Sequence, residues 1–234
     1  MKTMVLSLGG SVLVPSLESN NISRYASVLR EIARVCRIYV VIGGGGEARR
    51  YISTARSLGI DEARSDDLGI AVTRLNAALL AGALQEAAYP GIAATCSEAV
   101  RFGESEKIVV MGGVAPAQTT DAVSAVLAEY VHADVLVNAT SVDGIYSADP
   151  KKDPNAVRYE ALTPEELIAI IAGDRLNAGS NAVIDIVAAK VVQRSAIPLV
   201  VLDGRDPENL KSAILGGTYR GSVVHPEKQN PLPL

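Results

Sequence analysis

The chain has little of the chemistry that disulfides, redox centres and histidine-rich metal sites require. Its 234 residues include two cysteines, two histidines and no tryptophan. Cys36 and Cys96 lie far apart in the sequence, each in apolar surroundings, so we interpret them as buried thiols rather than as a disulfide framework. This cysteine usage favours a cytoplasmic location. Because His132 and His225 are the only histidines, a histidine-rich metal site is not expected.

Positive charge is also scarce. The chain carries 22 lysines and arginines against 26 aspartates and glutamates, a net charge of −4 with a pI near 5.3. This balance argues against a nucleic-acid partner, because such partners are held mainly through phosphate contacts. No run of about eighteen apolar residues occurs, so we expect no membrane span. The first residues enter a strand pattern at once, so no signal segment is expected.

Several familiar motifs of nucleotide-binding proteins and hydrolases are missing as well. The P-loop sequence G-x-x-x-x-G-K-[ST] is absent, and the glycine groups do not have the G-x-G-x-x-G spacing of dinucleotide-binding proteins. Neither G-x-S-x-G nor C-x-x-C occurs. A nucleotide site in this chain must therefore use another glycine architecture.

What the sequence does contain is three junctions between a short apolar run and a group of glycines. They are Gly9-Gly10-Ser11 after Met4–Leu8, Gly43–Gly46 after Tyr39–Ile42, and Gly112-Gly113 after Ile108–Met111. Glycine has no Cβ, so its backbone N–H can approach an anion closely. A helix N-terminus behind it adds partial positive charge. One such junction is an ordinary tight turn, whereas three favour a nucleotide or another phosphorylated ligand.

The apolar pattern predicts alternating strands and helices in the first half. Strands are expected over Met4–Leu8, Ile38–Ile42, Ile92–Thr95, Lys107–Met111 and Val135–Asn138. Helices are expected over Ile22–Val35, Glu47–Leu58, a long segment with Asp67 as N-cap that runs to about Ala88 and ends before Pro90-Gly91, and Asp121–Val131. Short apolar runs with little alternation are typical of strands covered on both faces, and this order is typical of βαβ units.

The second half follows a polar, proline-punctuated loop over residues 149–155. Helices are expected at about Pro164–Ala172, Ala182–Arg194 and Pro207–Leu215, and strands at Leu199–Leu202 and Ser222–Val224. No linker is long enough to separate two independent domains. The sequence therefore predicts an α/β protein, a three-layer α/β/α sandwich with a largely parallel central sheet, in which residues 1–234 form one domain with two lobes.

Further motifs follow in a specific order nearly from end to end. They are Leu8-Gly9-Gly10-Ser11, Val41-Ile42-Gly43-Gly44-Gly45, Asp66-Asp67-Leu68-Gly69-Ile70, Thr73-Arg74-Leu75-Asn76-Ala77, Met111-Gly112-Gly113 with Pro116, Thr119-Thr120-Asp121, Ala133-Asp134, and Thr140-Ser141-Val142-Asp143-Gly144-Ile145-Tyr146 with Asp149-Pro150. This order and spacing resemble the amino acid kinase superfamily and, within it, the archaeal-type uridylate (UMP) kinases.

The resemblance implies an enzyme of pyrimidine nucleotide biosynthesis that phosphorylates UMP to UDP by direct in-line transfer from ATP. It implies ATP and UMP as partners, Mg²⁺ as cofactor and, commonly, a homohexamer. Residues from about 1 to 133 would form the acceptor (UMP) lobe and residues from about 134 to 234 the ATP lobe.

The resemblance assigns two parts of the chain to the ATP donor. The implied ATP-binding residues are Gly9, Gly10, Ser11, Gly45, Arg49, Thr140, Ser141, Tyr146 and Asp149. Residues 9–11 would offer N–H donors and a hydroxyl to the phosphates, because phosphoryl transfer depends on positioning and charge neutralisation. Tyr146 offers a ring face for adenine, and Asp149 offers acceptors for the ribose.

The expected catalytic residues are Arg49, Gly10, Ser11 and Asp185. Arg49 lies one turn into the helix after the second glycine group, so its side chain can stabilise charge on the transferring group. The alternative is a solvated helix face shared with Arg50 and Arg56. Asp185 resembles an acidic position near the phosphates in related kinases, with an ordinary solvated acid as the alternative. No metal ligand is assigned, because the nucleotide phosphates would carry most of the Mg²⁺ coordination.

The acceptor side is assigned in the same way. The implied UMP-binding residues are Gly44, Asp66, Val114, Ala115, Pro116, Ala117, Gln118, Thr119 and Thr120. The Asp66 carboxylate is a double acceptor that suits the 2′- and 3′-hydroxyls of a ribose, and its alternative role is helix capping, for which Asp67 is the better candidate. Thr119 and Thr120 suit the uracil edge and the phosphate, although the same run is an ordinary N-cap for the following helix.

Four positions depart from the family pattern. Ser7 stands where many superfamily members carry a lysine, a change shared with the archaeal uridylate kinases, and Mg²⁺ and Arg49 are the candidates for the missing charge. Ala117 replaces a usual Pro-Gly, Gln118 a common histidine, and Gly46 a longer polar side chain. These changes lie in or beside the acceptor loops, so the choice of acceptor is less determined than the fold.

Two other functions stay open. One is a sister kinase of the same fold acting on acetylglutamate, aspartate, carbamate or isopentenyl phosphate. The combination of Asp66 with Thr119 and Thr120 favours a nucleotide acceptor, and the missing lysine disfavours the carboxylate kinases. The other is a non-catalytic nucleotide-binding or oxyanion-storage protein like the molybdenum-storage proteins, for which two histidines are few.

Overall fold

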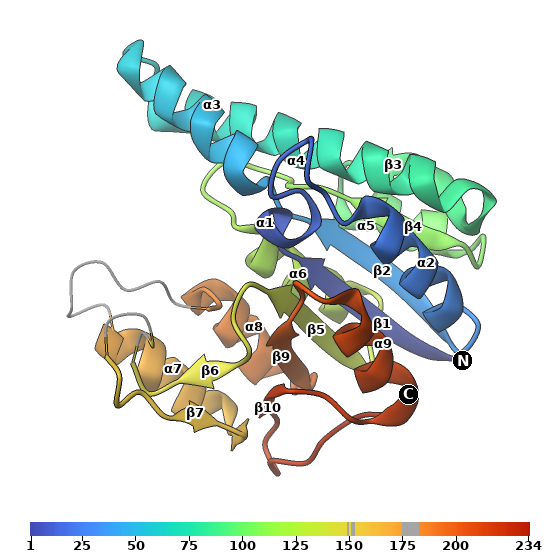
Figure 1. Cartoon of the computed structure of the whole chain (residues 1–234), viewed down its shortest axis with the longest axis vertical. Helices are drawn as coiled ribbons and strands as arrows, with labels where there is room; N and C mark the ends of the chain where they lie inside the picture. The colour runs from blue at the N-terminus through green and yellow to red at the C-terminus, as the bar shows by residue number, and fades with distance from the viewer. Residues whose placement is uncertain (149, 151–152, 175–182) are drawn as a thin grey trace.

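The computed structural model describes residues 1–148, 150, 153–174 and 183–234 (Figure 1). Within these ranges, eight strands form one sheet and two strands form a small second sheet. The strands are β1 (Lys2–Leu8), β2 (Cys36–Ile42), β3 (Ala88–Ala93), β4 (Ile108–Met111), β5 (Val135–Thr140), β6 (Ile145–Tyr146), β7 (Arg158–Tyr159), β8 (Ala161–Leu162), β9 (Leu199–Asp203) and β10 (Gly221–Val224).

The large sheet has the strand order β3-β4-β2-β1-β5-β9-β10-β8. Every neighbouring pair in it is parallel except β9 with β10, which confirms the prediction of a largely parallel sheet. Strand β1 pairs with β2 on one side and with β5 on the other, so that Leu8 lies opposite both Ile42 and Ala139. The strand order reverses direction here, and the carboxyl ends of strands at such a point are where open α/β sheets bind ligands.

Helices cover both faces of this sheet. They are α1 (Gly10–Leu13), α2 (Ile22–Ile32), α3 (Gly45–Ser57), α4 (Glu62–Leu84), the short 3-10 turn η1 (Gln85–Ala87), α5 (Cys96–Gly103), α6 (Thr120–Tyr130), α7 (Pro164–Asp174), α8 (Ile186–Ser195) and α9 (Pro207–Gly216). Helices α1, α2, α4 and α9 contribute to the apolar core on one face, and α5, α6, α7 and α8 to the core on the other. The three-layer α/β/α sandwich is therefore confirmed.

Alternating side chains of β1 explain how the central strand joins both cores. Met4, Leu6 and Leu8 are fully buried in the first core, whereas Val5 is fully buried in the second. Ser7 points to the same side as Val5, because successive residues of a strand face opposite sides of the sheet. The polar side chain closest to the carboxyl end of β1 is thereby directed at the face covered by α6.

The long helix α4 begins earlier than the sequence predicts. Asp67 was expected as its N-cap, but Asp61 has this role, and its side chain accepts a hydrogen bond from the Arg64 N–H. The polar turn from Glu62 to Ser65 has no apolar periodicity, so the sequence pattern missed it. Asp66 consequently lies in the second turn of α4 rather than before the helix.

The end of α4 differs from the expectation as well. The helix stops at Leu84 because Gln85 adopts φ 54°, and Pro90-Gly91 then lie inside β3 instead of terminating a helix. Proline is tolerated there because β3 is the edge strand of the large sheet. Helix α5 was not predicted, although Thr95 caps it and accepts from the Glu98 N–H at 3.1 Å.

Helix α4 is also long and apolar enough to cross a membrane by length and composition, with a mean hydropathy of 1.3 in its most apolar window. Figure 1 shows it lying beside α3 on one face of the molecule. About 39% of the window is buried, and Ala77, Leu80 and Leu84 of this helix belong to the core beneath it. Helix α4 therefore packs on the sheet of this fold through its buried apolar face.

Candidate active site

Two of the glycine junctions pack directly against each other at the carboxyl ends of the central strands. The Gly43 N–H donates to the Leu8 carbonyl at 2.9 Å, and the Gly9 N–H donates to the Ala139 carbonyl at 3.0 Å. A Cβ placed on Gly10 would lie 2.2 Å from the Gly45 nitrogen and 2.3 Å from the Gly43 oxygen. Backbone therefore meets backbone at this point, and only glycine leaves enough space.

Two polar side chains of α4 hold the glycine loops in place. Thr73 accepts a hydrogen bond from the Gly113 N–H at 2.7 Å, which brings in the third junction. The Asn76 amide donates to the carbonyls of Gly43 and Gly44 at 3.1 and 3.3 Å. Both side chains are buried, and they satisfy backbone groups of the glycine loops, although the Gly44 carbonyl also accepts from the Ala48 N–H at 3.4 Å.

A cavity of about 410 Å³ opens between α3, α4 and the loop after β4. Its walls collect most of the residues that the sequence assigned to the acceptor: Gly44, Asp66, Ala115, Ala117, Gln118, Thr119 and Thr120. Gly45 and Arg49, which the sequence assigned to ATP, line the same cavity, together with Ala48, Ile52, Gly69, Ile70, Thr73 and Gly113. The N-terminus of α3 lines the cavity, with Gly44 as an N-cap that supplies no capping side chain. Its first N–H groups are thus available to an anion.

The three arginines of α3 have different surroundings. Arg50 forms an ion pair with Glu47 at 3.0 Å, and Arg56 forms a bidentate pair with Glu62 at 2.9 and 2.7 Å. Arg49 lines the cavity and has no ion-pair partner among the residues that the structure describes. The solvated-face alternative therefore suits Arg50 and Arg56 better than Arg49.

Asp66 connects α4 with the loop that follows β4. Its Oδ2 accepts a hydrogen bond from the Ala117 N–H at 2.8 Å. Ala117 adopts φ 61°, a left-handed conformation that costs about 1 kcal/mol for a residue with a Cβ. The charge-assisted bond to Asp66 offsets this cost. The second oxygen of Asp66 accepts no hydrogen bond from the described residues and remains available to a ligand.

Thr119 and Asp185 link the N-termini of α6 and α8. Thr119 is the N-cap of α6, as the sequence allowed, and its hydroxyl donates to Asp185 Oδ2. Asp185 was expected inside a helix over Ala182–Arg194, but the helix begins at Ile186 and Asp185 is its N-cap, accepting from the N–H groups of Val187 and Ala188. Asp185 is thus held by three donors and is not an ordinary solvated acid.

The structure adds one residue that sequence reasoning missed. The Asp121 carboxylate, at the start of α6, accepts a hydrogen bond from the Ser7 hydroxyl at 2.9 Å. Burial raises the pKa of Asp121 to about 6, with a further contribution from the Asp185 charge, and the Ser7 bond opposes this rise. Ser7 and Asp121 are 114 residues apart in the sequence, so no local signal could have identified this pair.

The raised pKa of Asp121 makes stability depend on pH. The unfolded chain loses this proton near pH 3.8 and the folded chain near pH 6, so this residue's stabilising contribution is complete below about pH 4 and falls until about pH 6. We expect Asp121→Asn to become more stable than the wild type by up to about 2 kcal/mol as the pH rises from 4 to 7. Urea unfolding at several pH values, with EDTA and without nucleotide, measures this difference. A difference that does not change with pH would contradict the assignment.

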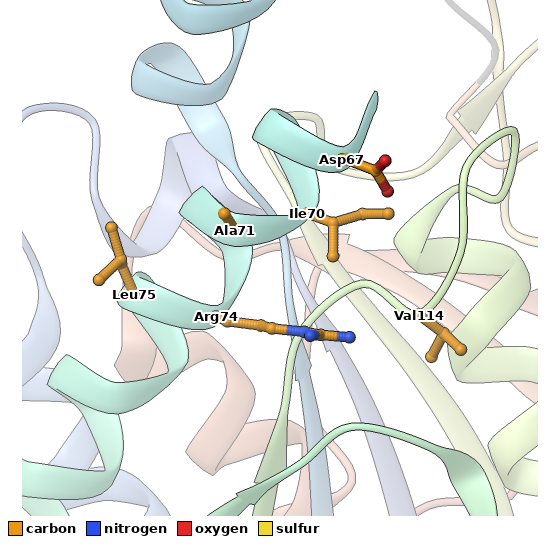
Figure 2. Close-up of a pocket in the computed structure, with 6 residues that line it drawn as sticks. All are labelled: Asp67, Ile70, Ala71, Arg74, Leu75 and Val114. Carbon is orange, nitrogen blue, oxygen red and sulfur yellow. The ribbon is translucent and has the colours of Figure 1, made fainter. Parts of the chain in front are cut away.

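Two further cavities adjoin the first. One of about 570 Å³ runs along α4 between Asp67, Ile70, Arg74 and Val114 (Figure 2). The other, about 300 Å³, lies behind the loop after β4 and shares Ala117, Gln118 and Thr119 with the first cavity. Val114 lines both adjoining cavities, so the loop over residues 114–119 is a thin wall between three hollows.

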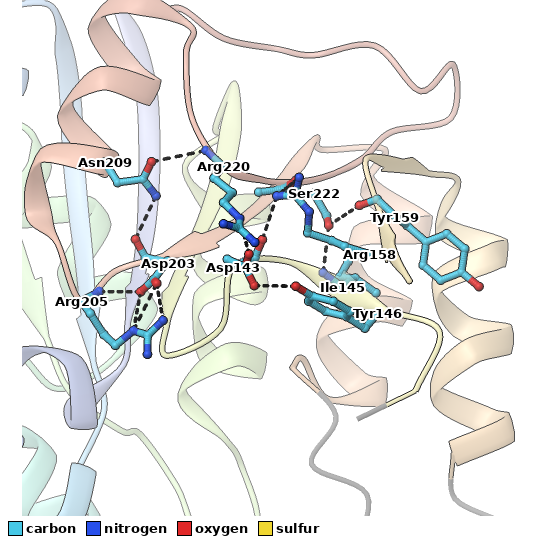
Figure 3. A network of polar contacts seen from close by, with 11 residues as sticks. Asp143, Ile145, Tyr146, Arg158, Tyr159, Asp203, Arg205, Asn209, Arg220 and Ser222 are labelled. Atoms are coloured by element: carbon cyan, nitrogen blue, oxygen red, sulfur yellow. Dashed lines mark hydrogen bonds and ion pairs between the residues drawn. The ribbon is translucent and has the colours of Figure 1, made fainter. Parts of the chain in front are cut away.

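The residues assigned to the donor base and ribose lie beyond β5. Thr140 ends that strand next to Gly9, since a Cβ on Gly9 would lie 3.9 Å from the Thr140 Cα. Tyr146 lies on the small β6–β7 sheet, and its hydroxyl donates to Asp143 at 2.8 Å (Figure 3). Ser141 is exposed in the connecting segment. Asp149 lies outside the described residues.

An ionic network fixes this donor side to the large sheet. Asp143 pairs with Arg220 at 2.5 Å, and Arg158 donates to the carbonyls of Asp143 and Gly221 (Figure 3). Burial would raise the pKa of Asp143, but the Tyr146 hydroxyl and the two arginines lower it overall. Asp143 therefore stays ionised, and it holds the Tyr146 ring in a defined orientation.

A parallel sheet with glycine junctions, an arginine and carboxylates at its switch point defines a nucleotide- or phosphate-handling α/β protein. The model of the amino acid kinase family matches residues 2–203. The chain belongs to this family.

Within this family, the chain is similar to proteins named uridylate kinase or UMP kinase. A uridylate kinase from Methanoculleus marisnigri is 66% identical over 233 residues, which cover 100% of both chains. The crystal structure of uridylate kinase from Archaeoglobus fulgidus has a TM-score of 0.85 and 45% identity, over 96% of this chain and 100% of that one. The UMP kinase structure from Bacillus anthracis, at 23% identity, has a TM-score of 0.79 over 97% of this chain and 96% of that one, and supports the fold alone.

Proposed function

We propose that this chain is a UMP kinase that transfers the γ-phosphoryl group of ATP to UMP, forming ADP and UDP. The proposal depends on one observation above the others: a cavity lined by glycine backbone, by Arg49 and by Asp66, in a chain 66% identical over its full length to a uridylate kinase. The glycine loops suit phosphates, and the free oxygen of Asp66 suits a ribose hydroxyl.

The chemistry follows from positioning and charge. Residues Gly9, Gly10 and Ser11 would hold the ATP phosphates, and Gly45 with the N-terminus of α3 would bind the transferring group. Arg49 would donate to the same group from the cavity wall, where a preorganised cation stabilises charge that develops during transfer. The acceptor phosphate would lie beside Gly44, so that the two substrates meet across a loop that the Asn76 amide fixes.

The nucleosides would lie to either side of this point. Asp66 would accept from the ribose of UMP, and the loop of Val114, Ala115, Pro116, Ala117, Gln118, Thr119 and Thr120 would enclose the rest of the acceptor. Thr140, Ser141, Tyr146 and Asp149 would hold the adenosine. Thr119 would act through its backbone, because its hydroxyl already donates to Asp185.

We propose Mg²⁺ as the cofactor, carried mainly by the phosphates. No group of three histidine, cysteine or acidic residues within the described ranges is arranged to hold a metal ion. The carboxylates of Asp121 and Asp185, which are near enough for the Asp185 charge to raise the pKa of Asp121, nevertheless suit Mg²⁺, which commonly binds one or two carboxylates together with substrate phosphates. When bound, the ion would neutralise phosphate charge, and Asp121 would be held in place by Ser7.

We also propose a cytoplasmic homo-oligomer, with a homohexamer as the expected assembly and one domain of two lobes in each chain. Exposed apolar side chains repeat along α4 at helical spacing: Leu68, Ala71, Leu75, Ala78 and Leu79. A stripe of this kind on a long surface helix suits a second copy of the chain. Light scattering that gives the mass of a monomer at micromolar concentration would rule out the assembly.

An ADP-release assay tests the function with ATP, Mg²⁺ and a panel of acceptors. The panel contains UMP, CMP, dUMP, AMP, acetylglutamate, aspartate, carbamate and isopentenyl phosphate. Strong turnover with UMP supports the proposal. Turnover with a non-nucleotide acceptor supports a sister kinase, and nucleotide binding without turnover supports a binding or storage protein.

Asp66→Asn tests the acceptor ribose. The amide keeps the size of the side chain and can still accept from the Ala117 N–H, but its NH₂ group cannot accept from a ribose hydroxyl. We expect KM for UMP to rise roughly tenfold, with little change in KM for ATP, since a hydrogen bond to a charged group is lost. The preference for UMP over dUMP should shrink in parallel. Equal effects on the KM values of UMP and ATP would remove Asp66 from the acceptor site.

A further inference from the structure

Arg74 lies on α4, about two helical turns after Asp66. It lines the cavity that adjoins the candidate active site. Figure 2 shows Asp67, Ile70 and Arg74 projecting from α4 toward the loop that carries Val114, and Ala71 and Leu75 complete the lining of this cavity. Ile70 lines this cavity and also the cavity that contains Asp66. The two cavities therefore adjoin each other at Ile70, on the same helix.

The guanidinium of Arg74 lies in this cavity and keeps N–H donors that form no hydrogen bond with the described residues. Its Nε donates to the Gly113 carbonyl at 3.4 Å, and the side chain is half-buried. In the part of the chain that the structure describes, no carboxylate pairs with it and no acceptor receives a bond from its terminal nitrogens. An arginine has five N–H donors and no acceptor, so four donors remain for a ligand.

Helix geometry places Arg74 in line with the proposed ribose contact. Asp66, Ile70 and Arg74 follow each other at intervals of four residues, so they share one face of α4. The Cα atoms of Asp66 and Arg74 are about 12 Å apart along the axis, a length that a nucleobase and a long arginine side chain span together. A nucleotide whose ribose is bound at Asp66 can thus direct its base along Ile70 toward the guanidinium.

We propose that Arg74 recognises the acceptor base by donating to the C4 carbonyl of uracil, and so selects uracil over cytosine. This inference depends on the proposed function. Uracil presents an oxygen acceptor at C4, whereas cytosine presents an amino group there. A side chain that only donates can pair with the uracil oxygen, whereas beside the cytosine amino group the donors of both partners stay unpaired. In a half-buried site such unpaired donors disfavour cytosine.

The test compares the acceptor preference of Arg74→Met with that of the wild type. The acceptors are UMP, CMP and the 5′-monophosphate of 2-pyrimidinone riboside, which has only hydrogen at C4. We expect kcat/KM for UMP to fall roughly 10- to 100-fold, the factor that a hydrogen bond to a charged donor carries. The values for CMP and for the C4-unsubstituted analogue should change little, so the UMP-to-CMP ratio falls. Arg74→Lys, which keeps the charge, should retain part of the preference.

Arg64→Met is the matched control. Arg64 lies on the same helix, but its side chain is 80% exposed and pairs with Asp61, so the ratio should stay at the wild-type value. Thermal unfolding of each variant shows whether the fold is kept. A wild type that phosphorylates neither UMP nor CMP would defeat the proposed function itself. A wild type that prefers UMP, with the same ratio in Arg74→Met, would overturn only this inference, as would a change in oligomer mass without a change in the ratio.

Discussion

Gly10→Ala is expected to lower kcat/KM by at least about 10²-fold, because a displacement of about 1 Å at a reacting centre has an effect of this size. The Cβ of alanine would lie 2.2 Å from the Gly45 nitrogen and 2.3 Å from the Gly43 oxygen, far inside van der Waals contact. Both neighbours are backbone atoms, so no side chain can rotate away. One of the two glycine loops has to move, and the proposed positions of donor and acceptor phosphates move with it.

The same substitution is expected to destabilise the fold by about 1–3 kcal/mol, the usual cost of overpacking a tight contact. Urea unfolding and steady-state kinetics on the same preparation measure both effects. Gly216→Ala is the control, since a Cβ on Gly216 meets nothing within 4 Å and the residue ends α9. That variant should keep full activity and gain a fraction of 1 kcal/mol, roughly the helix preference of alanine over glycine. A Gly10→Ala enzyme with near-normal kinetics would show that the two loops do not meet as described.

The strands β1, β2, β4, β5, β9 and β10 and the glycine junctions were predictable because each depends on a local signal, whereas the two-residue strands β6, β7 and β8 were missed and β3 was placed too late. A strand covered on both faces is a short apolar run, and a close backbone approach needs glycine. The N-cap of α5 is also local: the Thr95 hydroxyl accepts from the Glu98 N–H, and the Glu98 carboxylate accepts from the N–H of Ala94, the residue before the cap. That helix could have been found from Thr95 and Glu98, three residues apart.

Other features depend on residues that are distant in the sequence. Asp121 is enclosed by Ser7, 114 positions earlier, and by Asp185, 64 positions later, so no local pattern shows that its pKa is raised. The Asp66–Ala117 bond joins α4 to a loop 51 positions away. Asp66 and the loop were both assigned to the acceptor from the sequence, but only the fold shows that the Asp66 carboxylate accepts a hydrogen bond from the loop. The arginines of α3 are a further case: only the fold shows that Arg50 and Arg56 form ion pairs whereas Arg49 lines the cavity.

Arg49→Ala is expected to lower kcat by roughly 10²-fold or more, with a smaller change in either KM, if the guanidinium stabilises charge on the transferring phosphoryl group. The neighbouring residue Arg50 provides a matched control for this test. Arg50 has the same side chain one position further along α3 and is exposed like Arg49, but it pairs with Glu47, whereas Arg49 lines the cavity with Gly44, Gly45 and Asp66.

Arg50→Ala should therefore keep a wild-type kcat, because an exposed ion pair on a helix surface contributes little to stability or positioning. Arg49→Lys separates charge from geometry. Lysine keeps one positive charge but cannot make two parallel hydrogen bonds to a phosphoryl group, so recovery of only part of kcat indicates bidentate contact. If Arg49→Ala and Arg50→Ala lose activity equally, the loss comes from the total positive charge on the surface of α3 and not from a specific contact of Arg49. If neither loses activity, the charge that replaces the missing lysine at Ser7 has to come from the metal ion alone, and the catalytic role of Arg49 is wrong.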